Sequence, residues 1–182
     1  MTTATATTQT TTWTADPAHS SVEFAVKHLV VSTVKGTFGK FSARIATTDG
    51  ILSAIEADID PASIDTGIDQ RDQHLRSADF FDVATFPTMK FVSTGVTPKG
   101  EGEYAVDGLL TMHGETKPVT FRVEVEGTEI RDPWGNRRVG ATAIGKLSRK
   151  EWGLTWNQAL EMGGVMVSDE VKFTLNIAAT AN

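Results

Sequence analysis

The chain has 182 residues, of which 40% are hydrophobic, and its 17 basic and 23 acidic side chains give a net charge of −6. It contains no cysteine, which excludes a disulfide framework, a thiol nucleophile and a zinc site built on cysteine. No basic run is longer than a pair such as Arg137-Arg138, which disfavours a nucleic-acid partner, and no apolar stretch approaches the roughly 18 residues of a membrane-spanning helix.

Residues 1–10 are rich in Thr and Ala and have no apolar periodicity. We expect a disordered tail there, followed by a single domain over residues 11–180. The tail has neither the charged region nor the apolar region of a secretory signal. We therefore expect a soluble, cytoplasmic protein without stable membrane insertion.

Most of the remaining chain alternates apolar and polar residues with the period of two that is typical of β-strands. The first predicted strand begins at Ser21. Its apolar face consists of Val22, Phe24, Val26 and His28. A second strand is predicted over 34–47, where the apolar register changes between Gly36 and Gly39 and indicates a bulge or a sharp bend.

The dipeptide Asp49-Gly50 predicts a tight hairpin turn. It leads into a third strand, which Pro61 ends. The apolar face of this third strand consists of Ile51, Ile55, Ala57 and Ile59.

The densest run of charge in the chain, Asp65 to Asp82, is also its clearest helical window. Ile68, Leu75 and Ala78 form an apolar edge at helical spacing. Asp69, or a neighbouring Asp or Thr, is expected to cap the helix at its N-terminus.

Strands continue after the helical window and are joined mostly by short turns. The apolar faces of the clearest pair consist of Tyr104, Val106, Gly108, Leu110 and Met112, and of Val119, Phe121, Val123 and Val125. Short turns imply antiparallel neighbours, and one-sided strands imply a sheet that curls around its own apolar face. The predicted fold is an all-β, eight-stranded antiparallel barrel with one short helix inserted between strands 3 and 4.

The interior of an eight-stranded barrel is either filled by side chains or holds one small ligand. Alternation alone does not separate these cases, but the long apolar faces and the size of the chain favour a cavity. Such a cavity would be lined by Phe, Val, Ile and Met and would take an apolar ligand. Burial of about ten methylene groups of a long hydrocarbon would contribute about 8 kcal/mol before the cost of ordering the chain.

Arg71, Asp72 and His74 in the helical window could transfer protons or bind a phosphate. Alternatively, Arg71 and Asp72 pair with loop backbone and fasten the helix to the barrel rim, and the sequence favours this alternative over catalysis. His28 continues an apolar face, so we expect it to point inward near one end of the barrel. No two histidines have the spacing of a zinc pair and no nucleophile motif is present, so we expect neither a metal nor a catalytic residue.

A series of short motifs runs through nearly the whole ordered chain. In the first half these are Asp16-Pro17-Ala18-His19-Ser20, Val22-Glu23-Phe24, Val34-Lys35-Gly36-Thr37-Phe38, Ser63-Ile64-Asp65-Thr66, Arg71-Asp72-Gln73-His74-Leu75, Asp79-Phe80-Phe81-Asp82 and Phe86-Pro87. In the second half they are Gly108-Leu109-Leu110-Thr111-Met112-His113-Gly114, Thr116-Lys117-Pro118-Val119, Ser148-Arg149 and Trp152-Gly153. Over about residues 13–178, this series resembles the YceI-like polyisoprenoid-binding family.

The resemblance implies a lipocalin-like antiparallel barrel around an elongated apolar pocket for a polyisoprenoid chain. It also implies a carrier or storage protein, since members of the family are not established enzymes. The ligand could instead be a quinone, an isoprenoid precursor or another lipid, and no other cofactor is expected.

Strand faces and resemblance together predict a ligand site. The apolar chain of the ligand is expected to lie among Phe24, Val26, Phe38, Phe41, Leu75, Phe80, Phe81, Phe91, Leu110, Met112, Phe121 and Trp152. Its polar head is expected near His28, Arg71, Asp72 or His74.

Two other functions remain open. One is a barrel enzyme, an isomerase or hydrolase that acts on a small apolar substrate through His28 or His74. The other is a filled barrel that serves as a ligand-free, stress-related interaction module. A homodimer that pairs through the helical segment is also compatible with the sequence.

Overall fold

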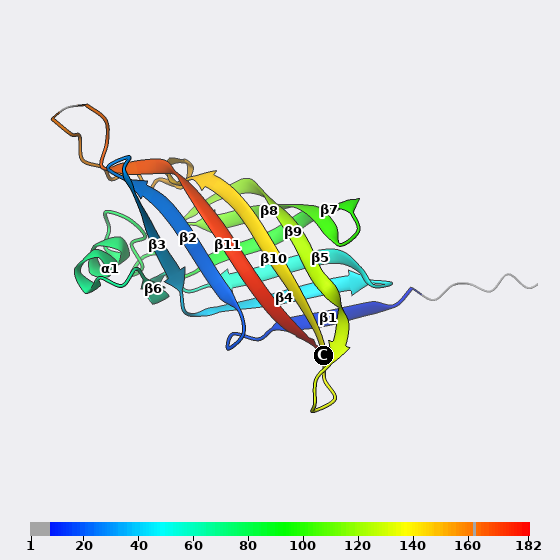
Figure 1. Ribbon diagram of the computed structural model, residues 1–182. Coiled ribbons are helices and arrows are strands. Elements are labelled where there is room, and N and C mark those ends of the chain that lie inside the picture. Colours follow the sequence, from blue (N-terminus) through cyan, green and yellow to red (C-terminus); the bar gives the residue numbers. More distant parts are fainter. Residues whose placement is uncertain (1–7, 162) are drawn as a thin grey trace, which may run out of the picture.

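The computed structural model describes residues 8–161 and 163–182, and these residues form an antiparallel sheet that curls into a barrel (Figure 1). The strands are β1 (Thr10–Ala15), β2 (Ser21–His28), β3 (Ser32–Phe38), β4 (Phe41–Thr48), β5 (Ile51–Ile59), β6 (Ile64–Asp65), β7 (Met89–Gly100), β8 (Glu103–Met112), β9 (Glu115–Arg131), β10 (Arg137–Ser148) and β11 (Val167–Ala181). The helical elements are η1 (Pro61–Ser63), α1 (Asp69–Arg76) and η2 (Arg149–Trp152). The predicted tail falls mostly on residues 1–7, outside the described residues, and β1 begins at Thr10.

Eight of these strands close the barrel in the order β1-β4-β5-β7-β8-β9-β10-β11, and β11 pairs back to β1. The pairs around this ring are antiparallel. The predicted all-β, eight-stranded antiparallel barrel is thereby confirmed. Helix α1 lies between β5 and β7, which are the third and fourth strands of the ring in chain order.

Strand β11 is long enough to have two successive partners along one edge. Its residues 179–181 pair with β1, and its residues 167–176 pair with β2. Strand β3 then pairs with β2, and β6 pairs with β3. Strands β2, β3 and β6 therefore continue the barrel wall at the end where α1 lies (Figure 1).

The predicted continuous strand over 34–47 is wrong, because the chain turns a corner at Gly39 and Lys40. Strand β3 ends at Phe38 and pairs with β2, whereas β4 begins at Phe41 and pairs with β1. The Gly39 amide donates to the Ser63 carbonyl (3.2 Å), which ties this corner to η1. The bend predicted near the two glycines exists, but it separates two strands and is not a bulge within one strand.

The predicted apolar face of the third strand is wrong at its first residue. Ile51 is 53% exposed, and its neighbour Leu52 is buried with 7% exposure. The pairing of β4 with β5 shifts register between Ala46 and Thr47. A shift of one residue exchanges the two faces of a strand, which brings Leu52 inward at this end.

Helix α1 is shorter than the predicted window and is not capped as predicted. Its N-cap is Ile68, which forms no capping side-chain hydrogen bond, so Asp69 is the first helical residue and not the cap. Asp69 and Asp72 in the first turn still favour the helix through its dipole. Ile68 is half-exposed, so it does not belong to a buried apolar edge.

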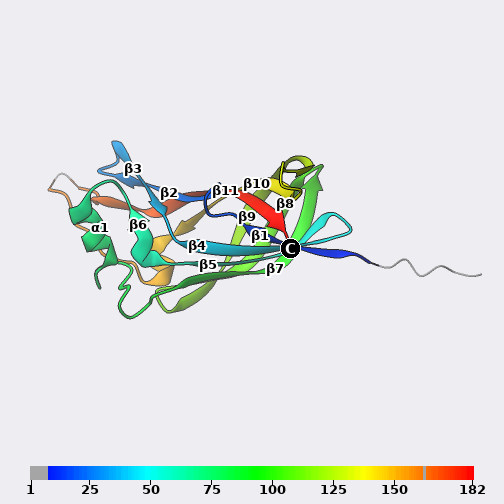
Figure 2. The same cartoon turned by 90° about the horizontal axis from the view of Figure 1, so that it is seen from below.

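The two ends of the barrel differ in how they are closed. Helix α1 and β6 lie at one end, and the C-terminus lies at the other (Figure 2). At the C-terminal end, Trp13, Leu52 and Ala179 are buried. Within the described residues, no helix is long and apolar enough to cross a membrane.

Candidate ligand-binding cavity

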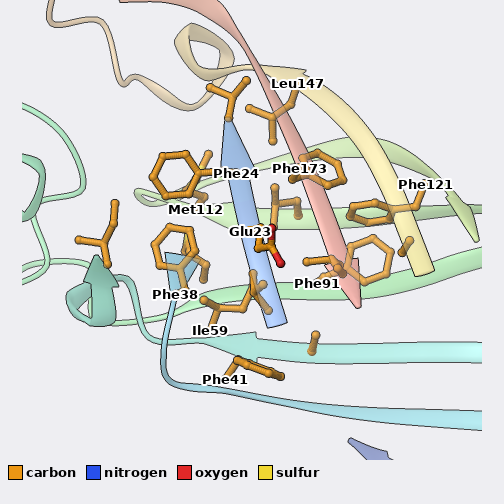
Figure 3. Close-up of a pocket in the computed structure, with 18 of the residues that line it drawn as sticks. Glu23, Phe24, Phe38, Phe41, Ile59, Phe91, Met112, Phe121, Leu147 and Phe173 are labelled. Atoms are coloured by element: carbon orange, nitrogen blue, oxygen red, sulfur yellow. The ribbon is translucent and has the colours of Figure 1, made fainter. Parts of the chain in front are cut away.

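An apolar cavity of about 230 Å³ lies inside the barrel. Inward-facing side chains of ring strands and of β2 and β3 line it (Figure 3). Leu75 of α1 also lines it, as do Phe80 and Phe81, which follow that helix. The lining side chains are apolar apart from Glu23 and Arg149. Alternation in each strand produces this lining, because every second side chain points to the inside.

Phenylalanine rings form two groups along the cavity (Figure 3). Near α1, the ring of Phe38 lies 5.5 Å from that of Phe24 and 5.8 Å from that of Phe81. Deeper in the barrel, the ring of Phe121 lies 4.7 Å from that of Phe91 and 4.8 Å from that of Phe173. Such tilted and edge-to-face pairs stabilise the wall beyond the area they bury.

Small side chains keep the space between these rings open. Alanines contribute to the lining from three strands, at Ala43, Ala57, Ala141 and Ala143. A larger side chain at any of these positions would extend into the cavity. The cavity therefore results from particular small residues on faces that otherwise carry large ones.

Both charged residues of the lining already form hydrogen bonds within the protein. The Glu23 carboxylate accepts hydrogen bonds from Ser21 Oγ (2.7 Å) and Asn176 Nδ2 (3.3 Å). The Arg149 guanidinium is buried and donates to the backbone carbonyls of Leu154, Trp156, Val167 and Ser168. Burial lowers the pKa of Arg149, and the nearby Asp169 carboxylate opposes this shift. Since both groups already have partners, the interior suits an uncharged ligand.

The structure places the predicted apolar residues around one cavity, with one exception. The residues that line it are Phe24, Val26, Phe38, Phe41, Leu75, Phe80, Phe81, Phe91, Leu110, Met112 and Phe121. Trp152 is not among the lining residues. Its side chain is fully buried, and its indole Nε1 donates to the Leu110 carbonyl (3.0 Å), so it supports the wall from behind.

The residues predicted to meet a polar head group do not line the cavity. Asp72 is buried and accepts hydrogen bonds from the amide (3.0 Å) and the hydroxyl (2.5 Å) of Thr66. Arg71 donates from Nε to the Thr66 hydroxyl (2.7 Å) and from Nη2 to the Thr66 carbonyl (2.8 Å). Both side chains fasten α1 to the segment that follows β6, which is the anchoring role considered from the sequence.

His74 belongs to an aromatic cluster at the helix end. Its Nε2 lies 2.8 Å from an Asp79 carboxylate oxygen, and its ring contacts those of Phe80 and Trp156 at centroid distances of 5.1 and 4.8 Å. Because Trp156 lies between η2 and β11, this cluster joins the helical segment to the loop that precedes β11.

His28 lies at the end of β2, opposite Val167 of β11. It does not line the cavity, although Val26 and Val167 beside it do. Within residues 8–161 and 163–182, no cluster of three or more His, Asp or Glu side chains could hold a metal ion.

Twenty of the lining residues were not among the predicted site residues. They are Val22, Glu23, Ala43, Ile45, Ile55, Ala57, Ile59, Ile64, Met89, Val123, Ala141, Ala143, Leu147, Arg149, Leu154, Val167, Val171, Phe173, Leu175 and Ile177. The alternation that identified the others also places Ile55, Ile59 and Phe173 on inward faces, so the same signal could have found them. Arg149 and Leu154 lie in a segment without apolar alternation, so the sequence carried no signal for them. Only the folded structure shows that they line the cavity.

Comparison with known proteins gives a consistent result. Residues 13–179 match the YceI-like domain family. The chain is 41% identical over 165 residues to UPF0312 protein SAB2563 of Staphylococcus aureus (strain bovine RF122 / ET3-1), which covers 90% of this chain and 94% of that protein.

Solved structures share the architecture. The crystal structure of BcnA from Burkholderia cenocepacia superposes with a TM-score of 0.79 at 26% identity, covering 91% of this chain and 99% of BcnA. A polyisoprenoid binding domain from Saccharophagus degradans, implicated in plant cell wall breakdown, superposes with a TM-score of 0.68 at 17% identity, covering 93% and 98%. The second likeness shows the shared fold alone.

Proposed function

Since this chain belongs to the family of YceI-like domain proteins, we propose that it binds a polyisoprenoid or a similar long-chain lipid inside the barrel and carries or stores it. The observation that carries this proposal is the cavity of about 230 Å³ with its apolar lining. The name of the Saccharophagus degradans domain gives the ligand class for a protein of the same fold. An uncharged hydrocarbon chain fits a lining whose side chains are apolar apart from Glu23 and Arg149.

The size of the cavity indicates how a long chain would fit. Its volume is just below the roughly 300 Å³ at which typical ligand pockets begin. A long chain would therefore need additional space, which the flexible side chains of Met89 and Met112 in the lining could provide. Movement of α1 and the following Phe80-Phe81 away from the rim would enlarge the cavity further.

The polar head of the ligand belongs at the helix end in this proposal. Trp13, Leu52 and Ala179 are buried near the opposite end, and none of them lines the cavity. Arg71 and Asp72 are occupied with Thr66. His28 remains the best candidate for a contact, because it lies next to the lining residues Val26 and Val167.

The geometry gives less support to the other functions considered. A filled barrel predicts no cavity, and this barrel has one. An enzyme that works through His28 or His74 needs these rings to face its substrate, and neither lines the cavity. A cytoplasmic location and a homodimer remain predictions from the sequence.

Native mass spectrometry of gently purified protein tests the proposal. We expect a lipid-bound species, or uptake of one molecule of an added prenyl alcohol such as geranylgeraniol by the empty protein. Repeated absence of bound lipid together with no uptake of prenyl alcohols would contradict the proposal.

A further inference from the structure

The turn between β2 and β3 exposes three consecutive apolar residues, which we call the apolar tip: Leu29, Val30 and Val31. Their exposed fractions are 38%, 77% and 86%. The tip lies at the helix end of the barrel, where the hairpin projects beside the loop that precedes β11 (Figure 1). Single exposed apolar residues are common on proteins. Three consecutive ones at a projecting turn form an exposed apolar patch, which is typical of an interaction site.

The backbone of the apolar tip is held in an unfavourable conformation. Leu29 has a φ of 51° and Val30 a φ of 62°, in the left-handed region that Gly, Asn and Asp tolerate best. A β-branched residue such as Val30 is an outlier there, and Asn-Gly would form this turn with less strain. Strain of this kind concentrates at functional sites, and here it presents apolar side chains to solvent.

The apolar tip is continuous with the wall of the cavity. The Leu29 amide donates to the Met166 carbonyl (2.8 Å), and His28 pairs with Val167. Val26 and Val167 both line the cavity, so only a few residues separate the tip from the interior. The tip therefore stands at the end of the barrel where the proposed function places the polar head of the ligand.

The two charged side chains of the hairpin that carries the apolar tip are both positive. The hairpin from Phe24 to Thr37 carries Lys27 and Lys35 and no acidic residue, in a chain whose net charge is −6. Both lysines are exposed, and within the described residues neither forms an ion pair. The acids at the start of β11, Asp169 and Glu170, are paired with Lys150 and Lys146 instead. Two exposed lysines beside an apolar projection can contact an anionic surface.

We propose that the apolar tip inserts reversibly into the surface of an anionic lipid bilayer and places the helix end of the barrel against it. A projecting turn has no groove of its own, and a fluid bilayer accommodates it without a matching pocket. Lys27 and Lys35 then meet anionic headgroups while the valines enter the boundary of the acyl chains. The bilayer becomes the source from which the lipid of the proposed function passes into the cavity, so the role in loading rests on that function.

Flotation with vesicles of phosphatidylcholine and phosphatidylglycerol tests this proposal. The protein should float with these vesicles and less with pure phosphatidylcholine. A Val30→Asp/Val31→Asp variant should bind them at least about tenfold more weakly, because each valine loses its apolar burial. Asp tolerates positive φ better than Val, so this variant should fold.

A matched control lies at the opposite end of the barrel. Trp134 in the β9–β10 turn is 80% exposed, and its Trp134→Asp variant should bind vesicles as well as the unaltered protein. Lys27→Gln/Lys35→Gln should remove most of the preference for phosphatidylglycerol. Equilibrium binding of geranylgeraniol in detergent solution should not change in the tip variant, which separates this proposal from the proposed function.

Three results would overturn the proposal: no flotation of the unaltered protein, equal flotation of the tip variant, or loss of flotation in Trp134→Asp alone. A change of the tip variant from dimer to monomer without any effect on vesicle binding would also overturn it, because it would assign the tip to a second copy of the chain. Normal flotation with no binding of prenyl alcohols would leave the docking surface intact and reject the proposed ligand.

Discussion

Asp72 is one of three charged residues of the helical window for which the sequence allowed catalysis and favoured anchoring. A charged trio on a short helix is compatible with both roles, since residue types alone do not show where the side chains point. In the structure, the buried Asp72 carboxylate accepts both the amide and the hydroxyl of Thr66. A buried carboxylate with these bonds stabilises the start of the helix and leaves little capacity for a ligand.

Replacement of Asp72 by Ala should lower the free energy of unfolding by about 2 kcal/mol, because it leaves the Thr66 amide without its charged acceptor. Asp72→Asn, which keeps an acceptor oxygen, should lose less. Urea titrations of both variants measure these changes, and the exposed Gln73→Ala on the same helix serves as control. A variant with unchanged stability but weakened binding of geranylgeraniol would instead assign Asp72 to the head group.

Part of the apolar lining could be predicted residue by residue, where it follows strand alternation. Phe24, Phe91 and Phe121 lie on clean alternating strands, and all three line the cavity. Trp152 was predicted as a lining residue, but its indole N–H requires an acceptor when buried. That acceptor, the Leu110 carbonyl, holds the ring behind the wall.

At the level of elements, the sequence predicted which segments are strands better than where their registers change. Leu52 faces inward because pairing between β4 and β5 slips after Ala46. Such a slip depends on two strands at once and leaves no mark in the alternation of either one. The corner at Gly39 is similar, since it exists because β3 and β4 pair with different strands.

A cluster of charges joins two distant turns at the C-terminal end of the barrel. Arg138 of β10 donates to an Asp132 carboxylate oxygen in the β9–β10 turn (2.7 Å) and to Asp16 in the β1–β2 turn (3.0 Å). Hydrogen bonds from Arg138 and His19 lower the pKa of Asp16 from 3.8 to about 2. The hydrogen bond from Arg138 also holds the pKa of Asp132 well below its ordinary value.

Acid should therefore weaken this cluster of charges. A carboxyl group whose pKa is lower in the folded state stabilises the fold above its ordinary pKa, and this stabilisation is lost as pH falls through the folded pKa. For Asp16 the loss should fall between about pH 4 and about pH 2. The difference in unfolding free energy between the unaltered protein and Arg138→Gln, measured against pH, should shrink across this interval.

Lys146→Gln provides the comparison for the acid experiment, because its ion pair with Glu170 is largely exposed. Its effect on stability should be small at every pH. A difference between the unaltered protein and Arg138→Gln that stays constant from neutral pH to pH 2 would show that Arg138 does not act through these carboxylates.

At the level of the whole molecule, closure of the barrel could be predicted and the cavity could not. Eight one-sided strands with short turns leave few alternatives to a closed barrel. Filled and hollow barrels have the same alternation, so the volume depends on how particular side chains meet across the interior. Ala57 and Ala143 leave space that larger residues at the same positions would fill.

The central claim is that the space inside the barrel holds the lipid, and one comparison tests it most directly. Ala143 faces the cavity and Thr142, its neighbour in β10, does not line it, so Ala143→Phe and Thr142→Phe add the same ring to opposite faces. Ala143→Leu repeats the test with a smaller side chain, and circular dichroism verifies the fold of each variant. Native mass spectrometry should show that geranylgeraniol binds to Thr142→Phe as to the unaltered protein and that both Ala143 variants lose most of it. Equal binding by folded Ala143→Phe and Thr142→Phe would contradict the claim.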